Sequence, residues 1–262
     1  MVLIKTYDKN NKSLFILTLA KLVKMHAKCY NNFKIKGGFM IIVIEGTDGS
    51  GKATQTKLLN ESLQKLGFKT KVISFPNYAS NSSAPVKMYL GGELGNNADC
   101  LNAYQASALF AVDRLLTMKL VDVSAYDFII LDRYTPSNMI HQACKIANTS
   151  ERVSCLDWLN DFEYGKLNLP KPDKILFLDL PTEISLNLAH SRKDLKNGQK
   201  QDIHENDTAY MQKAYDCAKF VANKYNWEVI KCYEGDQILP IETIHEKILE
   251  ALDIPYGKTS NL

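Results

Sequence analysis

The segment Ile41-Ile-Val-Ile-Glu-Gly-Thr-Asp-Gly-Ser-Gly-Lys-Ala-Thr-Gln55 constrains the fold of this chain more than any other. Its first four residues are apolar and β-branched, as in a buried strand. The sequence Gly46-x4-Gly51-Lys52 follows, and leucines then recur at helical spacing. A glycine loop between a strand and a helix is typical of phosphate binding. A strand-to-helix turn without a ligand is the alternative, but the glycines and Lys52 together favour a nucleoside triphosphate site.

The loop offers phosphate oxygens both backbone and side-chain donors. Its glycines let several N–H groups converge on one phosphate, and the lysine can reach the β- and γ-phosphates. The usual motif continues with Ser or Thr, whose hydroxyl binds Mg²⁺, but Ala53 stands there. We expect Thr54 or Asp48 to compensate, or water and phosphate oxygens to hold the metal. The residues predicted to bind the triphosphate, which the resemblance described below identifies as ATP, are Gly46, Thr47, Asp48, Gly49, Ser50, Gly51, Lys52, Ala53 and Thr54.

Composition places the chain in a broad class. A length of 262 residues with 45% hydrophobic residues suits one α/β domain with its own core. The six cysteines form no Cys-x-x-Cys pair, so we interpret them as reduced thiols of a cytoplasmic protein, with no disulfide or metal role. No stretch reaches the ~18 apolar residues of a membrane-spanning helix, so we expect no membrane association.

Residues 1–39 differ from the rest of the chain. They carry eight lysines and one aspartate, so the remaining residues have a net charge of −4 although the whole chain has +3. A mildly acidic body argues against a nucleic-acid-binding surface. We interpret residues 1–39 as a translated leader or disordered extension, with Met40 as the start of the domain. A targeting peptide or anchor is the alternative.

Strand and helix patterns alternate after the glycine loop. Short apolar runs predict strands at 71–74, 128–131, 174–178 and 227–232, with helical periodicity between them. Strands that are apolar on both faces predict a parallel sheet covered on both sides. The fold class is therefore α/β, a P-loop NTPase-type three-layer fold with a five-stranded parallel sheet flanked by helices. We expect one domain over residues 40–255.

Two segments of this pattern have particular roles. Residues 102–123 are predicted to form a long helix that lines the core through Leu109, Val112, Leu116 and Leu120. The polar, basic segment 191–206 interrupts two helical patterns, and we interpret it as a short lid that closes over the reacting groups. A solvated charged surface is the alternative interpretation.

Two residue pairs indicate chemistry beyond the loop. Asp132 and Arg133 follow a predicted buried strand, at the end where parallel sheets bind ligands. The aspartate suits Mg²⁺ and the arginine a phosphate, although a solvated ion pair is the alternative. Phe110 and Arg114 lie four apart on one helix face. They suit a base that is stacked and hydrogen-bonded, or equally an arginine stem packed on a ring.

These residues together resemble the thymidylate kinase family over residues 40–252. The resemblance rests on the glycine loop, Phe75-Pro-Asn-Tyr78, Phe110-Ala-Val-Asp-Arg114, Asp132-Arg-Tyr-Thr-Pro-Ser-Asn138 and the lid region. It implies transfer of the γ-phosphoryl group of ATP to dTMP with Mg²⁺. It also implies a homodimer formed through the long helix.

The resemblance implies roles for single residues. Lys52 and the loop backbone hold the ATP phosphates, and Asp48 lies between the nucleotides near the sugar and the metal. The implied metal ligands are Asp48 and Asp132. The implied dTMP-binding residues are Asp48, Phe75, Tyr78, Phe110, Arg114, Arg133, Ser137, Asn138 and His141, with Phe110 stacking on thymine, Arg114 and Asn138 bonding its edge, and Arg133 and Tyr78 positioning the phosphate. The implied catalytic residues are Asp48, Lys52, Arg133 and Arg192.

Ala53, Asn77 and His141 depart from the family pattern, whereas the place of the catalytic arginine follows one of the family's two types. The family places its catalytic arginine in the glycine loop or in the lid, and because the loop here has Ser50, the lid must supply it. Arg192 is the only arginine in that segment. Asn77 stands where many relatives have a basic residue, so Arg133 carries more of the phosphate binding. His141 stands where many relatives have a larger aromatic ring, so we expect weaker exclusion of ribonucleotides.

Two other functions remain open from the sequence. One is a different nucleoside or nucleotide kinase, which an acceptor panel with ATP would distinguish. The other is a non-catalytic nucleotide-binding regulator, whose only support is Ala53. A guanine-recognition segment of the Asn-Lys-x-Asp type is absent from the sequence.

Overall fold

The computed structural model describes residues 39–193 and 208–254. Five parallel strands form the central sheet in the order β2-β3-β1-β4-β5. Their bounds are Met40–Glu45 (β1), Thr70–Ser74 (β2), Phe128–Asp132 (β3), Lys174–Asp179 (β4) and Glu228–Lys231 (β5). The predicted five-stranded parallel sheet is therefore confirmed. The predicted leader, up to residue 38, and most of the predicted lid lie outside the described residues.

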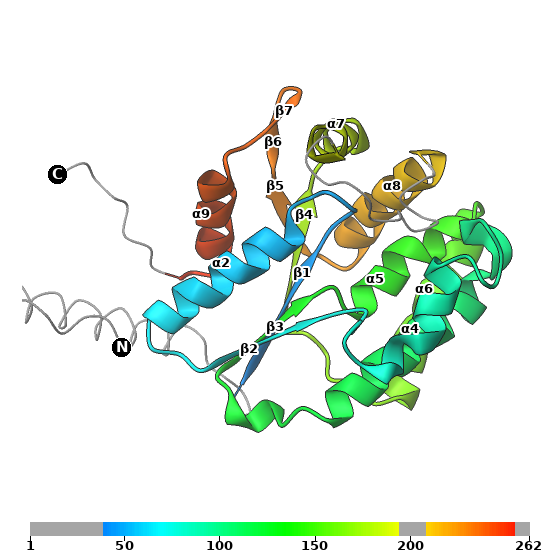
Figure 1. Cartoon of the computed structure of the whole chain (residues 1–262), viewed down its shortest axis with the longest axis horizontal. Coiled ribbons are helices and arrows are strands. Elements are labelled where there is room, and N and C mark those ends of the chain that lie inside the picture. The colour runs from blue at the N-terminus through cyan, green and yellow to red at the C-terminus, as the bar shows by residue number, and fades with distance from the viewer. Residues whose placement is uncertain (1–38, 194–207, 255–262) are drawn as a thin grey trace, which may run out of the picture.

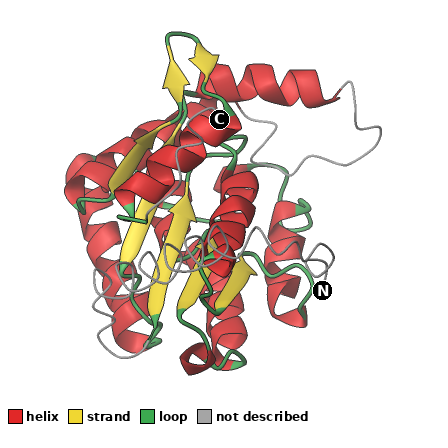
Figure 2. Ribbon diagram, turned by 90° about the vertical axis from the view of Figure 1, so that its left-hand side faces the viewer, coloured by secondary structure: helices red, strands yellow, loops and turns green. Residues whose placement is uncertain are grey.

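Helices cover both faces of this sheet (Figures 1 and 2). Helices α2 and α9 lie on one face, and α4, α5, α6 and α8 lie on the other. The helix bounds are Lys52–Lys65 (α2), Ala84–Leu90 (α3), Ala103–Lys119 (α4), Thr135–His141 (α5), Thr149–Asn160 (α6), Thr182–Lys193 (α7), Thr208–Lys224 (α8) and Ile241–Ala251 (α9). This is the three-layer arrangement that the sequence predicts.

Strand β1 shows why the sheet needs two layers of helices. Its side chains alternate between the faces, and all of them are buried. Ile42 and Ile44 pack in one core cluster with Leu59 of α2. Ile41 and Val43 pack in another cluster with Met118 of α4. A strand buried on both sides has no polar face, which explains its continuous apolar sequence.

Helix α4 turns a different face to the core than the sequence predicts. Val112 and Leu116 are 43% and 47% exposed, and Leu120, just beyond the helix, is 85% exposed. The buried residues are mostly small or polar, with one large apolar side chain, Met118: Ala103, Ala106, Ser107, Ala111, Asp113, Arg114, Thr117 and Met118. Leu109 is partly buried and packs against a core cluster, as predicted. The prediction was wrong for Val112, Leu116 and Leu120, because periodicity identifies an apolar face without identifying what covers it.

Three local elements complete the described fold. A short antiparallel hairpin, β6 (Tyr233–Glu234) and β7 (Gln237–Ile238), follows β5 and was not predicted. Helix α5 ends at His141 and is followed by a 3₁₀ turn at Ala143–Lys145. Helix α6 continues into a π-helical turn at Asp161–Lys166.

The structure also bears on the expectations about membrane helices and cysteines. Among the described residues, no helix is both long enough and apolar enough to cross a lipid bilayer. The five described cysteines are free thiols, and four of them are buried. Burial suits a cysteine that serves as a small apolar core residue.

Candidate active site

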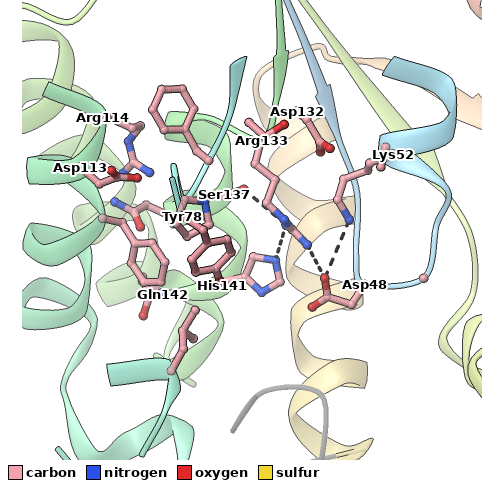
Figure 3. Close-up of a pocket in the computed structure, with 18 of the residues that line it drawn as sticks. Asp48, Lys52, Tyr78, Asp113, Arg114, Asp132, Arg133, Ser137, His141 and Gln142 are labelled. Atoms are coloured by element: carbon pink, nitrogen blue, oxygen red, sulfur yellow. Dashed lines mark hydrogen bonds and ion pairs between the residues drawn. The ribbon is translucent and has the colours of Figure 1, made fainter. Parts of the chain in front are cut away.

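A cavity of about 440 Å³ opens where β1 and β3 end, at the carboxyl edge of the sheet (Figure 3). Parallel sheets bind their ligands at this edge. The glycine loop forms one wall, and residues of α4 and α5 form the opposite wall. The predicted site residues that line it are Asp48, Gly49, Gly51, Lys52, Ala53, Thr54, Phe75, Tyr78, Phe110, Arg114, Asp132, Arg133, Ser137, Asn138 and His141.

The glycine loop has the backbone geometry of an anion site. Gly49 and Gly51 have φ values of 82° and 89°, in the left-handed region that glycine adopts without strain. A Cβ atom on Gly49 would lie only 3.2 Å from Cβ of Ser185. Helix α2 begins at Lys52, directly after the loop. Its first N–H groups have no partner inside the helix, so they can bind an anion.

Lys52 is buried at the base of this loop. Its Nζ donates to the carbonyl oxygen of Thr47 at 2.8 Å and lies 3.9 Å from Oδ1 of Asp48. Burial, with the nearby charge of Arg133, lowers the pKa of Lys52 from 10.5 to about 8. Negative phosphate groups beside the ammonium would favour its charged form again.

Three buried hydroxyl groups near the loop have no hydrogen-bond partner among the described residues. They are Oγ1 of Thr47, Oγ of Ser50 and Oγ1 of Thr56. Buried polar atoms are paired in the great majority of cases. None of the three residues lines the cavity, so these hydroxyls do not by themselves mark a ligand site.

Two carboxylates face the cavity close to Lys52, those of Asp48 and Asp132 (Figure 3). Within the described part of the chain, no cluster of three or more His, Cys, Asp or Glu side chains is placed to hold a metal. Mg²⁺ commonly takes one or two carboxylates and completes its shell with water and substrate phosphates. The two carboxylates therefore fit Mg²⁺ in combination with a bound nucleotide.

Arg133 occupies the centre of the cavity. It directly follows β3 and has a φ of 64°, in the left-handed region that is rare for a residue with a Cβ. Its Nη2 donates to Oδ1 of Asp48 at 2.5 Å, and its Nη1 lies 3.1 Å from Nε2 of His141. Burial lowers the pKa of Arg133, but Asp48 and Glu45 outweigh that effect and raise it above its ordinary value. The guanidinium stays charged and points into the site.

Glu45 forms an ion pair with Arg133 and was not among the predicted site residues. Its side chain is fully buried at the end of β1. Oε1 accepts from the Gly46 N–H at 3.0 Å and from Nη1 of Arg133 at 3.3 Å, while Oε2 accepts from Ser137 at 2.7 Å. Burial raises the pKa of Glu45, and Arg133 opposes that rise. The sequence signal was a carboxylate that ends an otherwise apolar strand.

A second network lies on the wall formed by α4 and α5. Arg114 is 1% exposed and forms a bidentate pair with Glu163, with Nε to Oε2 at 2.6 Å and Nη2 to Oε1 at 2.7 Å. Asn138 donates to the same Oε1 at 2.7 Å. Phe110 is half-buried one turn before Arg114. Arg114 lies across the cavity from Lys52 (Figure 3).

The segment after β2 is fixed by another carboxylate. Asp113, which is 1% exposed, accepts from the backbone N–H of Asn77 at 2.8 Å and from Oγ of Ser82 at 2.5 Å. Asn77 also donates through its side chain to Thr117 at 3.2 Å. Asn77 thus anchors this segment to α4, and neighbouring Tyr78 remains 53% exposed at the cavity mouth.

The structure brings most predicted residues together but leaves some apart. Gly46, Thr47 and Ser50 belong to the loop without lining the cavity. Arg192 lies near the end of α7, and its side chain is outside the described residues. Sequence reasoning missed Glu45, Asp113, Gln142 and Glu163. Gln142 lines the cavity, is 1% exposed, and its Oε1 has no hydrogen-bond partner among the described residues.

Comparison with known proteins gives one consistent family. A profile of the thymidylate kinase family matches residues 44–248. Thymidylate kinase from Mycobacterium tuberculosis is 30% identical over 177 residues, which cover 66% of this chain and 81% of that protein. The human thymidylate kinase is 29% identical over 212 residues, covering 79% and 87%. A solved structure of thymidylate kinase from Candida albicans has a TM-score of 0.61 at 24% identity, covering 82% of this chain and 91% of that one.

Proposed function

This chain belongs to the thymidylate kinase family, and we propose how its own residues divide the work of transferring the γ-phosphoryl group of ATP to dTMP. One observation carries the assignment. A single cavity joins the glycine loop with Lys52 to a wall bearing Phe110 and Arg114, and Arg133 lies between them. The cavity therefore suits two nucleotides placed with their phosphates together.

The loop side binds ATP. The N–H groups of the glycine loop and the start of α2 hold the phosphates, and Lys52 contacts the β- and γ-phosphates. The ATP-binding residues are Gly46, Thr47, Asp48, Gly49, Ser50, Gly51, Lys52, Ala53 and Thr54.

The wall formed by α4 and α5 binds dTMP. Phe110 stacks on thymine, Arg114 and Asn138 bond its edge, and Arg133 holds its phosphate with help from Tyr78. Phe75, Ser137, His141 and Gln142 complete this side. Asp48 stands between the two nucleotides and already contacts Arg133 and Lys52.

Mg²⁺ is the proposed metal, held by Asp48 and Asp132 together with ATP phosphates and water. When bound, it neutralises phosphate charge. The residue after the lysine is alanine, and the next residue on the cavity wall that carries a hydroxyl is Thr54, in the first turn of α2. Substituting Ala53→Ser supplies the missing hydroxyl. We expect it to lower the Mg²⁺ concentration for half-maximal rate, and an unchanged or higher requirement would remove Ala53 from the metal's surroundings.

Transfer requires positioning and charge neutralisation more than covalent chemistry by the protein. Lys52 and Arg133 hold the two phosphate groups from opposite sides. Arg192, in the proposed lid of residues 191–206, adds positive charge to the transferring group in the transition state. Ser50 leaves the loop without an arginine, which supports this role for the lid.

We further propose an oligomeric state, a cellular location and domain boundaries for the enzyme. The exposed stripe of Val112, Leu116 and Leu120 on and after α4 supports a homodimer formed through this helix. Free thiols at the described cysteines support a cytoplasmic location. The acidic body favours small nucleotides over nucleic acid as ligands. Residues 40–255 form one catalytic domain, preceded by an extension at 1–39.

A coupled assay of ATP consumption with a panel of monophosphates tests the proposal. We expect turnover with dTMP to exceed that with dUMP, dCMP, dGMP and thymidine itself. Preference for another acceptor would favour a different nucleotide kinase. Tight ATP binding without transfer to any acceptor would favour a non-catalytic regulator, and either result would overturn the proposal.

A further inference from the structure

We propose that Glu163, which does not line the cavity, sets the hydrogen-bond polarity of the base-binding wall and so selects thymine over cytosine. This inference rests on the proposed roles of Arg114 and Asn138 in reading the base. Glu163 touches neither nucleotide site itself, so it is a positioning residue. It is 1% exposed and lies in the π-helical turn Asp161–Lys166, beside the cavity wall.

The carboxylate of Glu163 is an obligate acceptor, so every polar group that faces it must donate. Three donors meet it. Arg114 contributes Nε at 2.6 Å and Nη2 at 2.7 Å, and Asn138 contributes Nδ2 at 2.7 Å. The side chains of Arg114 and Glu163 are 2% and 1% exposed. Their geometry is therefore held without competition from solvent.

This arrangement decides which end of the Asn138 amide faces the base. Its second Nδ2 proton is donated to the backbone carbonyl of Ser107 at 3.1 Å. Both partners of Nδ2 are pure acceptors, so the amide cannot rotate by 180° without losing two bonds. Oδ1 is thus the atom that Asn138 can offer to the cavity, and it acts only as an acceptor.

Arg114, in contrast to Asn138, presents hydrogen-bond donors. Two of its five N–H donors are directed at Glu163, which leaves three for other partners, and Arg114 lines the cavity. The wall therefore offers one acceptor and one set of donors. Thymine matches this with its N3–H donor and O4 acceptor, whereas cytosine presents an N3 acceptor and an amino donor. Cytosine is mismatched at both positions.

The π-helical turn explains how Glu163 reaches this place. A π-helical turn inserts an extra residue into a helix and often occurs at functional sites. It follows α6 directly, and Thr135 at the start of α5 bonds the hydroxyl of Tyr164, next to Glu163. Two contacts from adjacent residues thus fix this turn against α4 and α5.

The substitution Glu163→Gln tests the inference, because it keeps the size but replaces one acceptor by a donor. We expect the ratio of kcat/KM for dTMP over dCMP to fall about tenfold or more. The change should come from a higher KM for dTMP, while KM for ATP stays unchanged. Glu163→Asp keeps both acceptor oxygens and should keep most of the preference. Asp161→Asn is the matched control, since it removes an exposed carboxylate from the same turn.

Several outcomes would overturn the inference. One is a Glu163→Gln enzyme with the wild-type preference, and another is an equal loss of preference in Glu163→Asp. The substitution Asn138→Ala separates the base-reading role of Asn138 from the positioning role of Glu163. If it keeps the preference, the base-reading role itself fails. If it loses the preference while Glu163→Gln retains it, only the role of Glu163 fails.

A measurement on the wild-type enzyme covers the case in which Glu163→Gln does not fold. Nuclear magnetic resonance of the Asn138 side-chain amide reports whether its two Nδ2 protons are already bonded. We expect slow exchange of both protons with solvent before and after dTMP is added. Fast exchange without dTMP, with new protection when it binds, would show that Nδ2 faces the base and would overturn the inference.

Discussion

Nη1 of Arg133 lies 3.1 Å from Nε2 of His141, and this pair determines which nitrogen of the imidazole carries the proton. Arginine only donates, so Nε2 accepts and the proton lies on Nδ1. The hydroxyl of Tyr210 agrees with this assignment. It donates to the carbonyl oxygen of His141 at 3.0 Å and lies 3.3 Å from Nδ1. The ring is therefore oriented from both sides, in a position that lines the cavity.

The small side chain of His141 leads to a prediction about the discrimination between deoxyribose and ribose. A tyrosine at this position extends further into the cavity than the imidazole and crowds a 2′-hydroxyl group. We expect His141→Tyr to raise the ratio of kcat/KM for dUMP over UMP by about tenfold. These two acceptors share one base, so the ratio isolates the sugar. An unchanged ratio would mean that another residue senses the 2′ position.

The pKa of Lys52 predicts how activity depends on pH. In the free enzyme this pKa is lowered from 10.5 to about 8 by burial and by Arg133, so Lys52 loses its charge as pH rises through about 8. We therefore expect kcat/KM for ATP to fall over that range, since this parameter reports the free enzyme. Lys52→Arg should lack the fall, whatever its absolute rate. A wild-type profile that stays flat well above pH 8 would contradict the prediction.

The same shift predicts an opposite trend in stability. Between pH 8 and 10.5 the unfolded chain binds a proton at Lys52 that the folded protein releases. Stability rises with pH wherever the unfolded state binds more protons. We expect the contribution of Lys52 to the free energy of unfolding to increase across this window. Urea unfolding of wild type and of Lys52→Met at both ends of the range measures the difference.

Arg192 is predicted to act in the transition state. We expect Arg192→Ala to lower kcat by about 10³-fold, as for arginines that neutralise a transferring phosphoryl group, with much smaller changes in KM for either nucleotide. Lys193→Ala, the adjacent cation, is the matched control. A near-normal kcat in Arg192→Ala would remove this residue from the catalytic role.

The exposed stripe of α4 predicts self-association. Leu116 is 47% exposed at the middle of the stripe, and an aspartate there would place a charge in an apolar contact. We expect Leu116→Asp to convert a dimer into a monomer in analytical ultracentrifugation. Val229→Asp changes an apolar residue that is 49% exposed on β5 and should leave the dimer intact. A wild-type monomer at micromolar concentration would contradict the proposed assembly.

The sheet and the loop were predictable because local sequence determines them. β1 is apolar up to Glu45, and the positive φ values at Gly49 and Gly51 favour glycine. The face of α4 was predicted wrongly, because Arg114 and Asp113 are buried by partners distant in sequence. Glu163 was missed for the same reason, since its partner Arg114 lies 49 residues away. Local patterns identify elements, but long-range pairing of charges decides which polar residues face inward.

The left-handed backbone of Arg133 has a consequence for the evolution of this protein. A residue with a Cβ held at a φ of 64° costs about 1–3 kcal/mol relative to a relaxed conformation. Glycine at this position would relieve that strain but would remove the guanidinium that the cavity surrounds. Selection for a more stable fold and selection for substrate binding therefore favour different residues at position 133, and the arginine shows which of the two pressures has prevailed.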